Sequence, residues 1–366
     1  MQSRLAEERG KRALALCREE GWDSLLVYGN AWRCDYLRYV TDFPILEGHG
    51  FALLDSDGSV TLYLDSALEV ERASVEAPAS KVVHAPDIVA ALTDRLHGAN
   101  GIIGVAPSGV MPFGLGTHLR DNMKPADAAF TRLLTCKSEL EIEAVRAAAR
   151  MADEGYEVFL ESARPGRTEY EVVADVEAFF RSRGCPDNFM IIGSGGRECM
   201  GMHPPGERRL QPGDMVTTEL TPCVNGYYAQ ICRTLVIGEP TPEHLAAFDI
   251  YKRSMEAGIE AVRPGVLASR IAEIENDVFR AEGLGEYTTS RYTRVRGHGM
   301  GIYLDTPPAI LEDVHMPLAE GMTIIVHPNT YHPAVGYIVL GDALVVRADG
   351  PELLTRTPRT LFSVPA

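Results

Sequence analysis

A change of pattern at Lys137 limits the possible folds of this chain more than any other feature of its sequence. Before that residue, short apolar runs such as SLLVYG, GFALLD, VTLYLD and GIIGVA alternate with helical segments, the first of which spans about 3–21. Further helical signals lie around 86–98 and 113–122. Strands that alternate with helices are typical of α/β domains. The sequence therefore predicts a smaller α/β domain at residues 1–132.

After this point, capped helices and clustered strands replace the alternation. Serine or threonine followed three residues later by glutamate forms a capping box, and such boxes predict helix starts at Ser138 and Thr168. Two more helices are predicted, one from Thr241 with proline at its first position and one over about 267–282. Between and after these helices lie the apolar runs DMVTTELTP, GYYAQICRTLVIG, GMTIIVHPN and GYIVLGDALVVR. We therefore predict an α+β domain at residues 133–366.

Charge and composition exclude several classes of partner. The 366 residues include 51 Asp and Glu against 35 Lys and Arg, which gives a formal charge of −16. Such a chain is repelled by nucleic acid and by anionic membranes, so we expect neither as a partner. No apolar run is long enough to cross a membrane, and the seven cysteines include no C-x-x-C pair. These features predict a soluble cytoplasmic protein with reduced thiols.

Residues 215–237 carry the most informative polar pattern. They predict two strands joined at Asn225-Gly226 by a loop that looks longer than two residues. Glu219 is a lone carboxylate in the middle of the first strand. The period of two puts four side chains of the second strand on one face: Tyr228, Gln230, Cys232 and Thr234. That face either lines a polar pocket or meets solvent.

Three histidines are candidates for chemistry. His298 lies between glycines in GHGMG, which lets backbone or substrate approach it closely. His327 follows the apolar run TIIV, where a strand would deliver it to the edge of a pocket. His203 lies in a Gly- and Pro-rich loop before the first strand of the pair. Each of the three also has a structural or solvated interpretation.

Taken together, these segments resemble the catalytic domain of the creatinase/aminopeptidase P/prolidase family, which has the pita-bread fold. The matching segments run over some 230 residues from Lys137: KSELEIEAVRAAARMA, the loop from His203 to Asp214, GYYAQICRT, GHGMGIYLDTPP and GMTIIVHPNTY. The N-terminal part resembles the family's smaller domain through YLRYVTDF and the strands after it. The resemblance implies an enzyme that is a hydrolase.

The departures from the family pattern concern its metal ligands. Peptidases of the family hold two metal ions with two Asp, one His and two Glu. Those positions fall on Glu219, Gln230, His298, His327 and Gly341, so one carboxylate replaces four. One carboxylate with neutral imidazoles cannot balance two divalent cations in a partly desolvated site. A dinuclear centre is therefore not expected, although a single metal on Glu219, His298 and His327 is conceivable.

Creatinase, a metal-free member, shows a similar loss of ligands. By resemblance, His203 falls on its general acid/base and Tyr228 on its substrate-contacting tyrosine, while its two substrate glutamates become Cys232 and His327. Cys232 is either an inert thiol or a nucleophile. Asp305 either orients substrate or caps the Thr-Pro-Pro turn after it, and one of the arginines before His298 could grip a substrate carboxylate.

We therefore expect a metal-independent, cofactor-free hydrolase of a non-peptide C–N bond, of the amidine, ureido or amide type, in a small molecule. The expected catalytic residues are His203, Glu219, His298 and His327, and the expected substrate-binding residues are Tyr228, Gln230, Cys232, Asp305 and His49. The alternatives are a Xaa-Pro dipeptidase with an altered single-metal site, a lyase, and a non-catalytic binding module.

The resemblance also implies a homodimer in which the partner's N-terminal domain completes each pocket. The sequence offers the polar, glycine-flanked loop 47–50 as the contributing segment, with His49 as its candidate contact. Exposure of this loop to solvent is the alternative.

Overall fold

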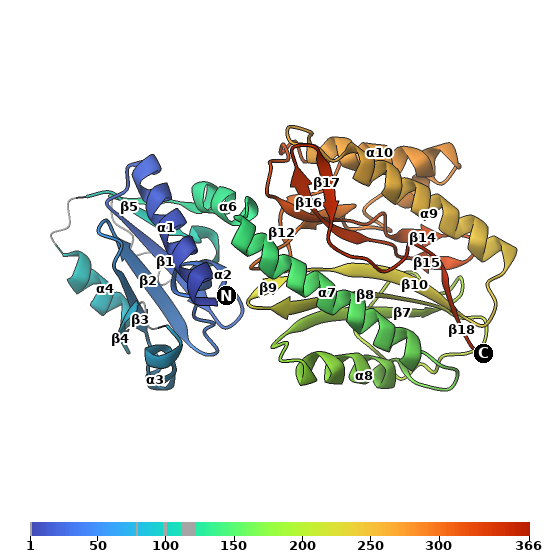
Figure 1. The fold of residues 1–366 in the computed structure, drawn as a ribbon, viewed down its shortest axis with the longest axis horizontal. Helices are drawn as coiled ribbons and strands as arrows, with labels where there is room; N and C mark the ends of the chain where they lie inside the picture. The colour runs from blue at the N-terminus through green and yellow to red at the C-terminus, as the bar shows by residue number, and fades with distance from the viewer. Residues whose placement is uncertain (1, 78–79, 98–100, 112–121) are drawn as a thin grey trace. The chain divides into compact units, whose positions relative to one another are not determined.

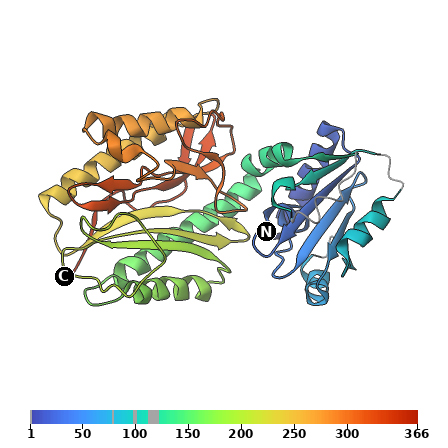
Figure 2. The same cartoon turned by 180° about the vertical axis from the view of Figure 1, so that it is seen from behind.

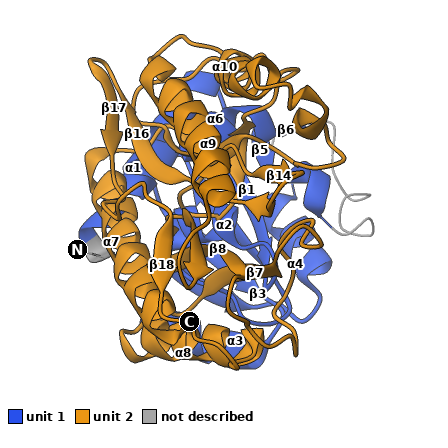
Figure 3. Cartoon of the chain, turned by 90° about the vertical axis from the view of Figure 1, so that its right-hand side faces the viewer, with its two compact units in different colours: residues 1–134 blue, residues 135–366 orange. Residues whose placement is uncertain are grey.

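Two units divide the chain, Met1–Leu134 and Thr135–Ala366 (Figure 3). The predicted boundary lay after residue 132. The computed structural model describes residues 2–77, 80–97, 101–111 and 122–366. Within that part, no helix combines the length and the apolar character that a membrane crossing requires.

A six-stranded mixed sheet forms the first unit, in the order β4-β3-β2-β1-β5-β6 (Figure 1). Its strands are β1 (Ser24–Asn30), β2 (His49–Asp55), β3 (Val60–Leu64), β4 (Ser80–His84), β5 (Ile103–Ala106) and β6 (Met123–Pro125). The helices are α1 (Gln2–Glu20), α2 (Asp35–Thr41), α3 (Ala67–Glu76), α4 (Ile88–Leu96), the short η1 (Ser108–Val110) and α6 (Asp127–Thr135). The helix predicted at 113–122 lies, apart from its last residue, outside the described residues.

The core of this sheet follows the apolar runs of the sequence. Tyr28 on β1 and Phe51 on β2 pack with Leu92 of α4 in one buried cluster. Apolar side chains on both strands and helices explain why this region forms an α/β layer.

Four long helices shape the second unit: α7 (Glu139–Ser162), α8 (Glu169–Ser182), α9 (Pro242–Ala261) and α10 (Ala268–Ala281), with the short η2 (Gly285–Thr288) after them. Both predicted capping boxes are present, because the Ser138 and Thr168 side chains accept the N3 backbone N–H groups of α7 and α8. Thr241 caps α9 with proline at its start, as predicted. These local signals fix the helix starts.

Two five-stranded sheets and a hairpin complete this unit. The first sheet has the order β18-β10-β8-β7, with β9 paired to β8, and contains β7 (Asn188–Gly195), β8 (Met215–Val224), β9 (Tyr227–Tyr228), β10 (Ile231–Ile237) and β18 (Phe362–Val364). The second has the order β12-β11-β13-β16-β17 and contains β11 (Gly297–Gly299), β12 (Thr306–Ala309), β13 (Thr323–Val326), β16 (Asp342–Arg347) and β17 (Gly350–Leu353). The hairpin consists of β14 (Thr330–His332) and β15 (Gly336–Ile338).

Helices cover the outer sides of these sheets (Figures 1 and 2). One buried cluster packs Phe159 of α7 and Phe180 of α8 against the first sheet. Another packs Tyr251 of α9 and Phe279 of α10 against the second. Where the sheets meet, the Cys232 and Gly341 backbones exchange hydrogen bonds of 3.1 and 3.0 Å. This junction holds the candidate site.

The turn between β8 and β9 is tighter than predicted. Val224 pairs with Tyr227, so only Asn225 and Gly226 lie in the loop, with φ values of 52° and 82°. Positive φ at both central residues is the geometry of a type I′ turn, which suits Asn-Gly. The predicted longer loop is wrong, because the strand pairing extends fully to the turn.

Candidate active site

The paired strands β8 and β10 bring three predicted site residues together. Cys232 lies directly opposite Glu219 in the register, which puts both side chains on one face. The Gln230 Nε2 donates a hydrogen bond of 2.9 Å to Glu219 Oε2, and the Cys232 Sγ lies 3.8 Å from the same oxygen. Because Gln230 and Cys232 are buried, this face does not meet solvent.

Glu219 is poised to exchange a proton near neutral pH. Burial raises the pKa of its carboxyl to about 7, although hydrogen bonds from Cys232 and Gln230 favour the charged form. Both of these bonds go to Oε2, and among the described residues Oε1 accepts none. Glu219 therefore has one oxygen open to a water or a substrate.

Cys232 is not prepared for nucleophilic attack. It is fully buried, and burial raises the pKa of its thiol far above the usual value. Since the thiolate is the reactive form, the interpretation as an inert pocket-lining thiol is favoured.

The two central histidines come from adjacent strands of the second sheet. His298 lies on β11, and His327 follows β13, which pairs with β11. Their ring centroids are 5.5 Å apart at an interplanar angle of 70°. Burial lowers the pKa of both imidazoles, so both are neutral at pH 7.

The hydrogen bonds of the two imidazole rings show which ring nitrogens can accept or donate a further hydrogen bond. The His298 Nδ1 donates to the Gly299 carbonyl at 3.0 Å, so its Nε2 carries the lone pair and accepts. The His327 Nδ1 is buried and has no hydrogen-bond partner in the described part of the chain. A buried ring nitrogen without a partner is costly, which indicates that water or a ligand completes this site.

Asp305 and Arg294 lie beside His298. The Arg294 Nη2 donates to Asp305 Oδ2 at 2.8 Å, and Asp305 Oδ1 lies 3.8 Å from His298 Nδ1. Of the three arginines before His298, Arg296 is buried and Arg291 stacks 5.1 Å from the Tyr292 ring centroid. Arg294 is two-thirds exposed, so its guanidinium is accessible to a ligand.

Sequence reasoning missed a buried support behind the pocket. The Asn329 Nδ2 lies 3.6 Å from Cys232 Sγ, and its Oδ1 accepts the Leu340 N–H at 3.0 Å. The Arg296 Nε donates to Asn276 Oδ1 at 2.6 Å, and the Arg296 carbonyl accepts the His327 N–H at 2.9 Å. The only sequence signal was the position of Asn329 two residues after His327.

His203 lies outside this cluster of Glu219, Gln230, Cys232, His298 and His327. Its side chain is 54% exposed, and its Nδ1 donates to the Pro204 carbonyl at 2.7 Å. It lines a cavity of about 370 Å³ in the loop before β8, together with Cys199 and Arg208. Within the described residues, no hydrogen bond joins His203 to the cluster. Its role as general acid/base stays a prediction.

Two other predicted contacts occupy local networks. The Tyr228 hydroxyl donates to Asp187 Oδ2 at 2.7 Å. His49, on β2 of the first unit, shares a hydrogen bond of 2.7 Å between its Nδ1 and the Tyr28 hydroxyl. Both roles in substrate binding stay predictions.

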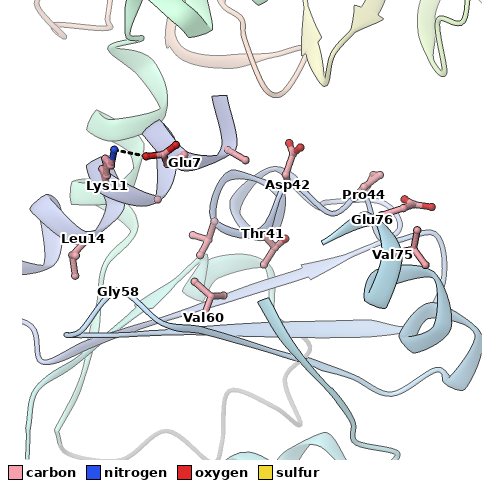
Figure 4. A pocket seen from close by; sticks show the side chains of 13 residues that line it. Glu7, Lys11, Leu14, Thr41, Asp42, Pro44, Gly58, Val60, Val75 and Glu76 are labelled. Atoms are coloured by element: carbon pink, nitrogen blue, oxygen red, sulfur yellow. Dashed lines mark hydrogen bonds and ion pairs between the residues drawn. The ribbon is translucent and has the colours of Figure 1, made fainter. Parts of the chain in front are cut away.

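The first unit has a pocket of its own, of about 820 Å³ (Figure 4). Apolar side chains such as Leu14 and Val60 line it, and the bonded pair Glu7 and Lys11 lies on α1 at its side. It contains none of the predicted site residues.

The two-metal centre that the resemblance implies does not fit these side chains. Glu219 and two neutral imidazoles supply one negative charge at most against two divalent cations. Gly341 offers no donor, and a Cβ there would lie 2.6 Å from the His327 Cβ and 3.2 Å from the Cys232 Cβ. In the described ranges, no three His, Cys, Asp or Glu side chains are grouped to hold even one metal ion.

Comparisons with known proteins agree on one family. The model of metallopeptidase family M24 matches residues 143–348. The Xaa-Pro dipeptidase of Pyrococcus horikoshii is 26% identical over 367 residues, covering 98% of this chain and 99% of that protein. A probable dipeptidase PepE of Mycobacterium tuberculosis is 32% identical over 236 residues, covering 64% of this chain and 62% of that protein.

Solved structures show the same fold over nearly the whole chain. The Xaa-Pro dipeptidase from Bacillus anthracis matches with a TM-score of 0.83 and 25% identity, covering 98% of this chain and 100% of that one. The X-Pro aminopeptidase from Thermotoga maritima matches with a TM-score of 0.88 and 22% identity, covering 97% and 99%. The predicted α+β pita-bread fold, preceded by a smaller α/β domain, is confirmed.

The predicted activity is corrected by the same comparisons. A metal-independent hydrolase of a non-peptide C–N bond is wrong, because the relatives are named dipeptidases. Their names favour the peptidase alternative, and the broader class of hydrolase is confirmed. The wrong activity has a physical reason. The loss of metal-ligand residues shows that the site carries fewer negative charges, but it does not show which bond is cleaved there.

Proposed function

Because this chain belongs to metallopeptidase family M24, we propose that it hydrolyses the amide bond of a dipeptide at the cluster of Glu219, His298 and His327. The observation that carries the proposal is the carboxyl of Glu219, with one oxygen open and a pKa of about 7, at the sheet junction where the second sheet carries two neutral imidazoles. The names of the relatives support Xaa-Pro dipeptides as the substrate class.

Glu219 would move the proton of the reaction. In its charged form, Oε1 takes a proton from the attacking water while the water oxygen bonds to the amide carbon. The same carboxyl then gives that proton to the departing nitrogen as the C–N bond breaks. A pKa near the working pH suits both steps, since each form is populated.

The other side chains would hold the substrate. The His298 Nε2 carries a lone pair and can accept an N–H of the substrate, as can a ring nitrogen of His327. Arg294 is exposed beside Asp305 and can turn to the free carboxylate of a dipeptide. No step is assigned to a metal ion, because the donor set does not fit the two-metal centre.

Hydrolysis of Gly-Pro, Ala-Pro and Met-Pro, followed by release of free proline, tests the proposal. The assay uses the purified protein as it stands, after EDTA, and with added Mn²⁺ or Co²⁺. Glu219→Gln should lower kcat by about 10²–10⁴-fold. The exposed Glu320 provides the matched control Glu320→Gln, which should keep wild-type turnover.

Absence of turnover on every dipeptide, under all three metal conditions, would contradict the proposal. Retention of full activity by Glu219→Gln would leave a dipeptidase but remove Glu219 from its mechanism.

A further inference from the structure

Tyr337 lies next to the cluster although no sequence signal marks it. It sits in the middle of β15 and pairs with Tyr331 on β14. Its backbone N–H donates to the Cys199 carbonyl at 3.0 Å, which ties the hairpin to the loop before β8. β15 also packs against β8, the strand that carries Glu219. These contacts hold Tyr337 beside β8 and the loop before it.

The hydroxyl of Tyr337 is unlike those of its neighbours. The Tyr331 hydroxyl donates to the Arg197 carbonyl at 3.0 Å, and the Tyr251 hydroxyl donates to the Thr330 carbonyl at 3.0 Å. Among the described residues, the hydroxyl of half-buried Tyr337 makes no hydrogen bond. A phenol keeps a strong donor for a ligand when the protein does not use it.

The surroundings of Tyr337 are those of the proposed reaction centre. The charged or titratable groups that act on its phenol include Glu219, Cys232 and Arg296, with Cys199 on the loop side. Burial raises the pKa of this phenol, so it stays protonated at neutral pH and can donate its hydrogen.

We propose that the Tyr337 hydroxyl donates a hydrogen bond to the carbonyl oxygen of the scissile amide. The inference rests on the proposed function, and it adds a residue that neither the family motifs nor the names of the relatives assign. As water adds to the carbonyl carbon, negative charge gathers on that oxygen. A preorganised neutral donor stabilises this charge more than the ground state, which raises kcat. No proton leaves Tyr337 in the step.

The chain offers a matched pair of variants on one hairpin. Tyr337→Phe removes an uncommitted hydroxyl, whereas Tyr331→Phe removes one that bonds to a backbone carbonyl. With Gly-Pro as substrate, Tyr337→Phe should lower kcat by about 10²–10³-fold with little change in KM. Tyr331→Phe should stay within about threefold of wild type. Circular dichroism confirms that both variants fold.

A second measurement does not depend on turnover. In protein labelled with 3-fluorotyrosine, the fluorine resonance absent from Tyr337→Phe belongs to Tyr337. Saturating Gly-Pro should shift that resonance, while the resonance assigned through Tyr331→Phe stays in place. Wild-type kcat in Tyr337→Phe, or an unmoved Tyr337 resonance at saturation, would overturn the inference while dipeptidase activity stands. A wild type that cleaves no dipeptide would count against the proposed function, and the resonance shift would still decide the Tyr337 contact.

Discussion

At the scale of single residues, the proton chemistry of the pocket depends on one carboxyl group. Glu219 shares its Oε2 with Gln230 and Cys232 and is buried. Burial therefore favours its protonated form in the folded chain, whereas the unfolded chain leaves it at its ordinary pKa of 4.5. The same property that suits it to move a proton makes it a source of instability at neutral pH.

This property predicts a pH-dependent stability. Between pH 4.5 and about 7, the folded state keeps a proton that the unfolded state has lost, so the free energy of unfolding falls as the pH rises. The contribution reaches roughly 3 kcal/mol above pH 7. Glu219→Gln removes it, so the variant should gain stability over wild type as the pH is raised from 4.5 to 8.

Urea unfolding of EDTA-dialysed protein at several pH values measures this difference. Glu320→Gln, at an exposed position, should run parallel to wild type across the range. A constant difference between Glu219→Gln and wild type from pH 4.5 to 8 would show that the Glu219 carboxyl titrates normally in the folded chain.

The sequence can predict a site residue when the residues that contact it lie nearby in the sequence. Gln230 and Cys232 were predicted to share a face because the strand period settles it, and the register seen in the structure adds Glu219 to that face. His298 and His327 were predicted from their motifs. Tyr337 was not, since its place beside Glu219 arises when β15 packs against β8, more than a hundred residues away in sequence.

At the scale of elements, the junction of the two sheets shapes the pocket. Cys232 on β10 and Gly341 before β16 exchange two backbone hydrogen bonds, and the Arg233 side chain donates to Asp342 at 2.6 Å. The backbones approach so closely that Gly341 has no room for a side chain beside His327. A carboxylate at that position would therefore require His327 to move.

Gly341→Ala tests how tightly this junction is packed. Its Cβ would lie 2.6 Å from the His327 Cβ, so the pocket wall must shift, and we expect a loss of about 1–3 kcal/mol in the free energy of unfolding. A Cβ at Gly201 meets nothing within 4 Å, so Gly201→Ala should stay within about 0.5 kcal/mol. Equal free energies of unfolding for the two variants in urea would show that the junction accommodates the extra Cβ without losing stability.

The individual helices and strands were more predictable than the contacts between them. Capping boxes at Ser138 and Thr168 placed two helix starts correctly, because a cap depends on four consecutive residues. The turn at Asn225-Gly226 was located, but its length was misjudged, since the sequence does not show how far the strand pairing continues toward the turn. Which sheet edges meet at Gly341 depends on packing between distant strands and carries no local signal.

At the scale of the whole molecule, the order of motifs predicted the fold, while the chemistry had to come from comparison. Five motif segments in the family's order, from Lys137 onward, were enough for the pita-bread prediction that the comparisons confirm. The lost ligand positions suggested a non-peptide substrate, and the names of the relatives contradict it. The fold can be predicted from many weak signals, each carried by residues close together in the sequence. Substrate choice depends on a few side chains whose neighbours come from distant parts of the sequence.

The last prediction concerns assembly, which we propose to be a homodimer in which His49 of one chain serves the pocket of its partner. Sedimentation should then show a dimer, and Glu219→Gln and His49→Ala should each lose activity on Gly-Pro. Mixing the two inactive proteins tests the sharing, because a heterodimer has one pocket with both residues intact. After complete random exchange of equal amounts, about a quarter of wild-type activity per chain should return. If His49 acts in its own chain, no heterodimer contains an intact site, and nothing returns. A monomer in sedimentation, or no recovery after exchange is verified by mass-labelled chains, would rule out the shared pocket.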